Sequence, residues 1–149
     1  MERSAERGLS IAFNPAPMHP DVFDYPLNRV GCFIINEIEG AELTGEIEPD
    51  DILSAMKDTY PQAAIVLTLG KKGVLFGDET ETVSVPAPVV KPVDTTAAGD
   101  TFIGYFLADF MHQRDIEATL RTACCAAAIC VTRPGAADAI PKRDEVDDA

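Results

Sequence analysis

Two continuous apolar runs of strand length stand out in the first half of the chain. Val30 to Asn36 reads VGCFIIN, and Ala63 to Leu69 reads AAIVLTL. Neither run alternates apolar with polar residues, which is typical of strands covered on both faces of a sheet. We therefore expect two buried strands here. A shorter strand is expected over Leu9 to Phe13, after a helix that ends at Gly8.

Apolar residues at helical spacing lie between and after these runs. An acidic first turn at Asp50, followed by such residues, predicts a short helix that ends at Tyr60. The same spacing predicts a helix from Phe102 to Phe110 and a second, small-residue-rich helix from Ile116 to Cys130. The tail from Val131 is expected to be a loop rich in glycine and proline that runs into a frayed acidic end.

Glycines and prolines divide the middle of the chain. Leu67 to Phe76 reads LTLGKKGVLF, and its two apolar runs joined by glycines predict a strand, a tight connection and an antiparallel partner. Thr82 to Val85 adds a short strand, and three prolines between residues 86 and 92 then keep the chain extended. Strands that alternate with helices indicate an α/β fold with a mainly parallel sheet, in which ligands bind at the carboxyl ends of the strands.

Composition limits the classes of function. The chain has 149 residues and 46% apolar content, which suits one soluble domain or part of one and excludes a disordered or membrane protein. The net charge of −13 argues against nucleic acid or an anionic membrane as a partner. The four cysteines lack the spacing of a zinc site and suggest a reducing, cytoplasmic compartment. No targeting or membrane-spanning segment is expected.

The stretch VDTTAAGDT carries the most informative chemistry. Ala97, Ala98 and Gly99 leave backbone N–H groups bare at the start of a helix, where the helix dipole favours an anion such as a phosphoryl group. Asp100 follows, and its carboxylate can accept a proton from a hydroxyl beside that pocket. This is the arrangement that phosphoryl transfer needs. The residues alone leave open that Asp100 simply caps the helix and that the small residues pack.

The stretch DTTAAGDTF resembles the signature of the ribokinase-like carbohydrate kinase family. The resemblance implies that Ala97, Ala98 and Gly99 form an anion hole and that Asp100 is the catalytic base. Four further segments match the family in the same order: NPAP at 14–17, NEIE at 36–39, TLGKKG at 68–73 and VTRPGA at 131–136. The AAGD form of the loop and the VTRPGA segment favour the ribokinase branch of this family.

Two of these segments carry implied binding residues. Asn36 and Glu39 match the family's NxxE motif, which helps to organise Mg²⁺ through water. Taken alone, they are equally typical of a solvated acidic turn. Thr68, Gly70 and Gly73 match the nucleotide-binding strand and loop of the family, although a plain hairpin explains the same pattern.

The resemblance also implies a monovalent-cation loop beside the anion hole. Asp94 and Thr96 match it, together with carbonyl groups near Arg133 and Gly135. The family commonly has a hydroxyl residue just before the Ile/Val-Pro pair of the tail, where this chain has Ala139. Because one oxygen ligand is then missing, we expect the potassium site to be weaker or to be completed by water.

The family fold is a three-layer α/β structure, a mainly parallel sheet with helices on both faces. Residues 1–149 match only its C-terminal, nucleotide-binding half, without the N-terminal half that supplies the sugar contacts and the lid. The implied reaction is phosphorylation of a sugar hydroxyl by ATP with Mg²⁺, ribose to ribose 5-phosphate above other sugars or nucleosides. Because such kinases exclude water by closing, we expect impaired activity. The alternative is a non-catalytic nucleotide-binding fragment or scaffold. Either way, uncovered apolar surface favours a homo-oligomer or pairing with the missing half.

Overall fold

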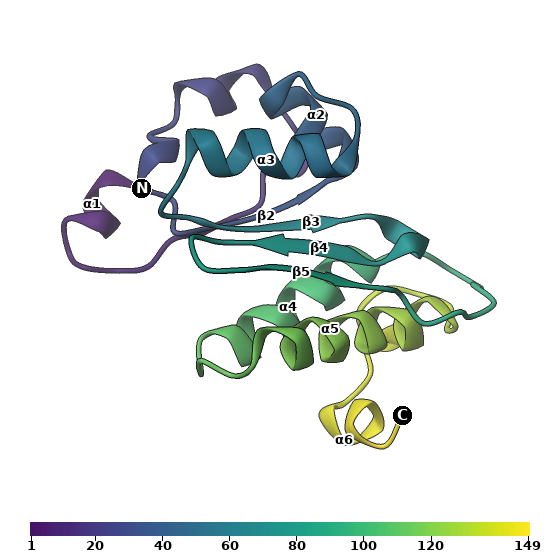
Figure 1. Ribbon diagram of the computed structural model, residues 1–149. Helices are drawn as coiled ribbons and strands as arrows, with labels where there is room; N and C mark the ends of the chain where they lie inside the picture. The colour runs from purple at the N-terminus through teal and green to yellow at the C-terminus, as the bar shows by residue number, and fades with distance from the viewer. The chain divides into compact units, whose positions relative to one another are not determined.

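The computed structural model describes residues 1–149 and contains a five-stranded sheet (Figure 1). Its spatial order follows the sequence order, β1-β2-β3-β4-β5. The strands are β1 (Ala12–Phe13), β2 (Cys32–Asn36), β3 (Ala64–Thr68), β4 (Val74–Gly77) and β5 (Thr82–Val85). By its contacts the chain divides into two units, residues 1–69 with 75–83, and residues 70–74 with 84–149.

The first three strands are parallel. β1 pairs with β2 and β2 pairs with β3, with Asn36 opposite Thr68 at the carboxyl end of the second pair. Only residues 69–73 connect β3 to β4, and a parallel crossover needs about a dozen residues or more, so β4 runs antiparallel to β3. The sheet is therefore mixed, with its parallel part at the β1 side.

Three helices belong to the first unit: α1 (Glu2–Ala5), α2 (Glu37–Thr44) and α3 (Pro49–Thr59). α2 and α3 contact each other and pack against β2 and β3. The core between them includes Phe33 and Ile65 from the strands and Ile52 and Met56 from α3, each at most 1% exposed. Ile52 and Met56 are four residues apart, so one face of α3 is buried, as its helical pattern predicts.

The second unit contains α4 (Ala98–Phe110), α5 (Ile116–Val131) and α6 (Arg143–Asp147). α4 and α5 pack side by side, as Figure 1 shows in green, and α6 packs against α5. Ala123, Ala126 and Cys130 of α5 are fully buried. Their small side chains let a neighbouring element approach the helix closely.

The structure confirms the expected strands and the three long helices to within a few residues, and the first helix ends at Ala5 instead of Gly8. Three further features differ from what the sequence predicts. The strand expected over Leu9 to Phe13 shortens to Ala12–Phe13. The acidic stretch after β2 starts α2 instead of forming a turn, because Asn36 caps a helix there. The tail is not frayed, since it contains α6 and several ion pairs.

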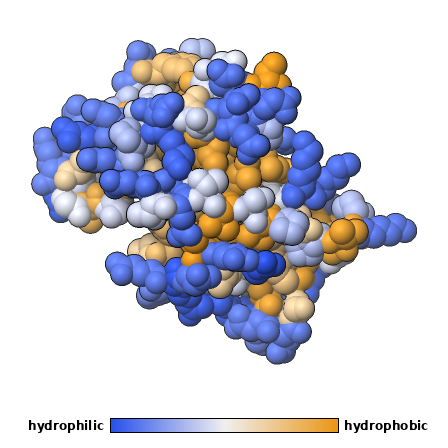
Figure 2. All heavy atoms as spheres, in the orientation of Figure 1, coloured by the Kyte–Doolittle hydropathy of each residue, from blue (hydrophilic) through white to orange (hydrophobic).

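Hydrophilic residues, drawn in blue, are prominent on the face shown in Figure 2, consistent with the high acidic content. Large hydrophobic side chains are nevertheless exposed in both units, among them Leu9, Phe23, Ile47, Val89 and Met111. None of the helices combines the length and apolar character that crossing a membrane requires.

Candidate functional site

The start of α4 presents backbone N–H groups without partners. Ala97 precedes the helix as its N-cap residue, and no side chain caps the helix. The Ala98 N–H donates a long bond of 3.3 Å to the Thr95 carbonyl, while those of Gly99 and Asp100 make no hydrogen bond within the chain. Free N–H groups at the positive end of a 13-residue helix are suited to an anion.

Gly99 has no internal reason to be glycine. Its φ is not in the left-handed region, and a Cβ added to it would meet nothing within 4 Å. Glycine in a helix costs about 0.5–1 kcal/mol relative to alanine. The open space in front of this exposed backbone therefore fits the close approach of a ligand group such as a phosphate oxygen.

Asp100 is the third residue of α4, and its side chain is exposed. It makes no hydrogen bond or ion pair in the structure, and it does not cap the helix. The alternative reading of Asp100 as a capping residue is therefore wrong. A solvent-facing carboxylate without a partner in the chain is free to accept a proton from a bound hydroxyl group.

Ala97 adopts the left-handed conformation, with a φ of +61°. For a residue with a Cβ this conformation costs about 1–2 kcal/mol. The chain thus stores strain at the residue that leads into α4, next to the unpaired N–H groups. Strain of this kind concentrates at functional loops.

Asp94 links the loop that precedes α4 to the loop that contains Gly135. Its Oδ1 accepts the Thr96 N–H at 2.9 Å, and its Oδ2 accepts the Gly135 N–H at 3.1 Å, 41 residues away in sequence. Hydrogen bonds from Thr96 and then from Gly135 lower the pKa of Asp94 below its ordinary value. The Val131 carbonyl adds bonds from the Val93 and Asp94 N–H groups at 2.7 and 3.2 Å.

The expected monovalent-cation residues are thus neighbours, although the donor set has gaps. The Thr96 carbonyl accepts a weak bond from the buried Cys130 thiol at 3.8 Å, which occupies one oxygen of the loop. Ala139 is fully buried in a short 3₁₀ turn and has no side-chain oxygen. The carboxylate of Asp94 and the free carbonyls near Arg133 and Gly135 are oxygen donors, as a hard cation requires.

Asn36 and Glu39 form a reciprocal capping box at the start of α2. The Asn36 Oδ1 accepts the Glu39 N–H, and the Glu39 Oε2 accepts the Asn36 N–H, both at 2.9 Å. Glu39 is only 5% exposed, so the reading as a solvated turn is wrong. This box explains both residue types by helix capping alone.

A role with Mg²⁺ is still compatible with this geometry. The Glu39 Oε1 makes no hydrogen bond and can accept one from a water of the ion. No group of three or more His, Cys, Asp or Glu side chains is placed to hold a metal. The residues therefore fit a hydrated Mg²⁺ that is held through water and through ligand phosphates.

The expected nucleotide residues divide into two kinds. Thr68 ends β3 opposite Asn36, and its hydroxyl donates to the Ile35 carbonyl at 3.3 Å. Gly73 has a φ of +116°, and an added Cβ would lie 2.0 Å from the Val85 carbonyl oxygen, so the hairpin itself requires glycine there. Gly70 has a φ of +55° but faces open space. Its surroundings leave room for a ligand.

The structure groups these residues by unit. Asn36, Glu39 and Thr68 meet at one end of β2 and β3 in the first unit. In the second unit, a hydrogen bond connects Asp94 to the Gly135 N–H. Glu145, which binds Arg133, was not among the residues expected from the sequence. Its only signal there is an acid three residues after Lys142 at a helix start, which is the spacing of a capping box.

Comparison with known proteins places this arrangement in a family. Residues 11–143 match the family described as pfkB family carbohydrate kinase. A ribokinase from Schizosaccharomyces pombe is 35% identical in an alignment of 151 positions that covers 95% of this chain and 47% of that protein.

Solved structures agree. The crystal structure of ribokinase from Thermotoga maritima superimposes with a TM-score of 0.82 at 32% identity, over 98% of this chain and 50% of that one. The Arabidopsis thaliana ribokinase complexed with ribose and ATP gives 0.83 at 28%, over 96% and 48%. The chain spans about half the length of the relatives it matches, and its fold is the ribokinase-like α/β fold, incomplete here. It belongs to the pfkB family of carbohydrate kinases.

Proposed function

We propose that this chain provides the nucleotide-binding and base-carrying half of a kinase that phosphorylates a sugar hydroxyl with ATP, with ribose as the first substrate to test. The observation that carries the proposal is the start of α4, where the unpaired carboxylate of Asp100 follows two backbone N–H groups without partners. Membership of a carbohydrate kinase family gives this geometry its chemical meaning.

The proposed step is an in-line phosphoryl transfer. Asp100 takes the proton of the sugar hydroxyl, and the hydroxyl oxygen bonds to the γ-phosphorus while the bond from phosphorus to the β-γ bridging oxygen breaks. ADP leaves with the electron pair of that bond. The N–H groups of Gly99 and Asp100, and the backbone of Ala97 and Ala98, stabilise the charge on the transferred group.

The remaining residues have supporting roles in this proposal. Thr68, Gly70 and Gly73 line the nucleotide, and Asn36 and Glu39 orient water of Mg²⁺, which offsets phosphate charge when bound. Asp94, Thr96 and the carbonyls near Arg133 and Gly135 hold a monovalent cation such as K⁺. Because the Thr96 carbonyl already accepts a bond from Cys130 and Ala139 has no side-chain oxygen, we expect this cation to bind weakly. Four free cysteines suit a reducing compartment such as the cytoplasm.

A second function follows from the length of the chain. Because it spans about half of its relatives, a non-catalytic nucleotide-binding role that requires another chain is the competing proposal. β1 is an edge strand of only two residues, and Leu9 and Phe23 nearby in sequence are 61% and 58% exposed. A strand this short offers few free backbone groups for pairing, so it is these exposed apolar side chains that favour contact with a complementary half or with a second copy.

Replacement of Asp100 by Asn separates the two functions. We expect Asp100→Asn to lower the rate of ATP-dependent ribose phosphorylation by about a hundredfold or more, with nucleotide affinity nearly unchanged. Asp51→Asn is the matched control, because Asp51 is also an exposed third residue of an α-helix without a capping bond. Isothermal titration with MgATP and a coupled assay of ADP release measure both quantities.

Each outcome decides between the proposals. Ribose-dependent ADP release that Asp100→Asn removes and Asp51→Asn keeps supports the kinase. Nucleotide binding without turnover in the unaltered chain supports the binding role. A chain that binds neither MgATP nor MgADP contradicts both. Light scattering tests the pairing, since a clean monomer contradicts self-association.

A further inference from the structure

The short C-terminal helix α6 is fixed to α4 by polar contacts. Asp109 of α4 is only 3% exposed, accepts a hydrogen bond from Arg143 at 2.8 Å and forms an ion pair with Arg114 at 3.2 Å. The Tyr105 hydroxyl donates to the Pro141 carbonyl at 2.8 Å, just before α6 begins. A buried carboxylate with two guanidinium partners anchors α6 more firmly than an exposed ion pair does.

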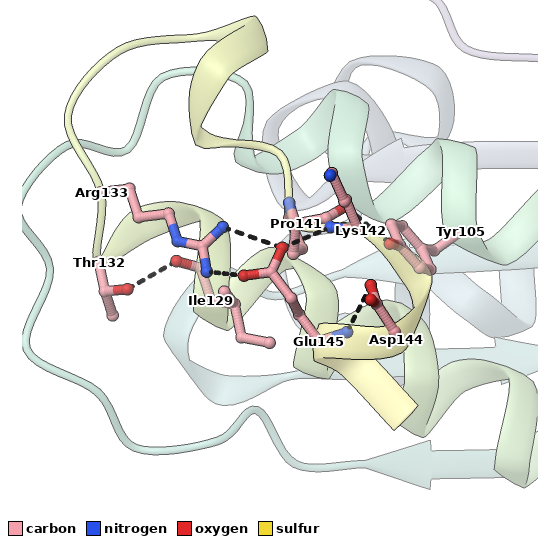
Figure 3. A network of polar contacts seen from close by, with 8 residues as sticks. All are labelled: Tyr105, Ile129, Thr132, Arg133, Pro141, Lys142, Asp144 and Glu145. Atoms are coloured by element: carbon pink, nitrogen blue, oxygen red, sulfur yellow. Dashed lines mark hydrogen bonds and ion pairs between the residues drawn. The ribbon is translucent and has the colours of Figure 1, made fainter. Parts of the chain in front are cut away.

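Glu145 of α6 uses both carboxylate oxygens. Its Oε1 accepts from the Arg133 Nη2 at 2.5 Å, and its Oε2 accepts the Lys142 N–H at 2.8 Å. Figure 3 shows the Arg133 guanidinium facing this carboxylate, with the backbone of Lys142 on its other side. The first turn of α6 therefore holds Glu145 in the orientation that meets Arg133.

The loop that carries Arg133 is held a second time two residues later, where the Gly135 N–H donates to Asp94 at 3.1 Å. Asp94 in turn accepts the Thr96 N–H at 2.9 Å, and Ala97 leads into α4. A continuous series of contacts thus runs from Glu145 through Arg133 and Gly135 to the Asp94 loop. Each link lies within the second unit.

We infer that Glu145 is a positioning residue for the nucleotide-phosphate site, an inference that rests on the proposed function. By holding Arg133, Glu145 keeps Gly135 against Asp94, and Asp94 keeps the turn that leads to the N–H groups of Gly99 and Asp100. Without this restraint the loop samples other conformations, and a bound phosphate has to order it again. Nucleotide affinity then falls although Glu145 touches no ligand.

Glu145→Gln tests this with little change in size. A Gln amide presents one oxygen and one NH₂ group, so it keeps at most one of the two hydrogen bonds. Glu117→Gln is the matched control, because Glu117 forms an exposed ion pair with Arg121 at 2.5 Å on α5, outside this series of contacts. Both variants lose one exposed carboxylate and one arginine contact.

Amide hydrogen exchange followed by NMR gives the first measurement, independent of any ligand. We expect Glu145→Gln to raise the exchange rate of the Gly135 N–H by about threefold or more, and Glu117→Gln to leave it unchanged. Titration with MgADP gives the second. Here we expect about a two- to fivefold weaker affinity for Glu145→Gln alone, with thermal midpoints similar for the two variants.

A third variant shows whether Glu145 acts through Arg133. Arg133→Gln should weaken MgADP binding to a similar extent, and the double variant Arg133→Gln with Glu145→Gln should be no weaker than either single one. Unchanged exchange at Gly135, equal affinity in Glu145→Gln and Glu117→Gln, or additive losses in the double variant would overturn the inference. An unaltered chain that binds no nucleotide overturns the proposed function and this role with it, whereas normal binding with unaffected Glu145→Gln overturns only the role.

Discussion

Asn36 lies directly opposite Thr68 in the register of the parallel strands β2 and β3. The Asn36 side chain caps α2 through the Glu39 N–H at 2.9 Å, and the Thr68 hydroxyl donates back to the Ile35 carbonyl at 3.3 Å. Two residues 32 positions apart thus share one end of the sheet. Capping by Asn36 is present in the structure, so a role in organising Mg²⁺ has to be measured separately from it.

Replacing Asn36 by Ala and by Ser makes this separation. Alanine removes the cap, so we expect the free energy of unfolding to fall by about 0.5–2 kcal/mol, whereas serine also caps helices and should keep most of it. If the amide oxygen also orients the Mg²⁺ hydration shell, both variants weaken nucleotide binding in Mg²⁺ more than in EDTA. Urea denaturation and nucleotide titrations measure the two effects. Wild-type affinity in Asn36→Ser would limit Asn36 to capping.

Gly99 and Gly104 form a matched pair on α4, since an added Cβ meets nothing within 4 Å at either position. Alanine at each should therefore be tolerated, with stability unchanged or raised by up to about 1 kcal/mol. Only Gly99 adjoins the unpaired N–H groups. We expect Gly99→Ala to weaken MgATP binding about tenfold and Gly104→Ala to leave it unchanged. Equal affinities would contradict a phosphate contact at Gly99.

The left-handed backbone of Ala97 predicts that glycine at this position raises the free energy of unfolding. Ala97→Gly removes the Cβ strain at a φ of +61° but loosens the unfolded chain, for a net gain of about 0.5–1 kcal/mol. Gln113 has a φ of +51° just beyond the other end of α4, and Gln113→Gly should stabilise similarly. Thermal unfolding checks both. A loss of stability in Ala97→Gly alone would mean that the methyl group makes a compensating contact.

The burial of the cysteines predicts which thiol reacts with an added reagent. Burial raises the pKa of Cys32 from 9.0 to about 12, and burial followed by the charge of Cys125 raises that of Cys124 from 9.0 to about 11. Both thiols are neutral in the folded chain at pH 8, so a disulfide reagent should react quickly with half-exposed Cys125 only. Cys125→Ser should remove the fast phase.

The same shifts fix how stability depends on alkaline pH. Above pH 9 the unfolded chain loses thiol protons that the folded chain keeps, so the free energy of unfolding should be level from pH 7 to 8 and fall above pH 9. Urea midpoints at pH 7.5 and 10 test this. Cys32→Ala should reduce the fall, and an equal fall in this variant would assign it to other groups.

Much of the fold follows from local pattern. The continuous apolar runs at Cys32–Asn36 and Ala64–Thr68 are strands, as expected for residues that are buried on both faces of a sheet. The residues from Phe102 to Phe110 form a helix, because their spacing places the apolar side chains on one helix face. Glycine is harder to interpret. The sequence presents Gly70 and Gly73 as equals, but only Gly73 lies against the Val85 carbonyl, a contact made by a strand that follows later in the chain.

The sequence by itself determined the α/β pattern, the small-residue loop before α4 and the family resemblance, because these depend on residue types at fixed local spacing. Only the tertiary structure decided that Asp94 bonds to Gly135, that Glu39 is buried in a capping box, and that Glu145 holds Arg133. Two of these relationships join residues 41 and 12 positions apart, and the burial of Glu39 depends on what packs around the start of α2. Spacing along the chain does not encode such pairings, and folding has to bring the atoms together before they exist.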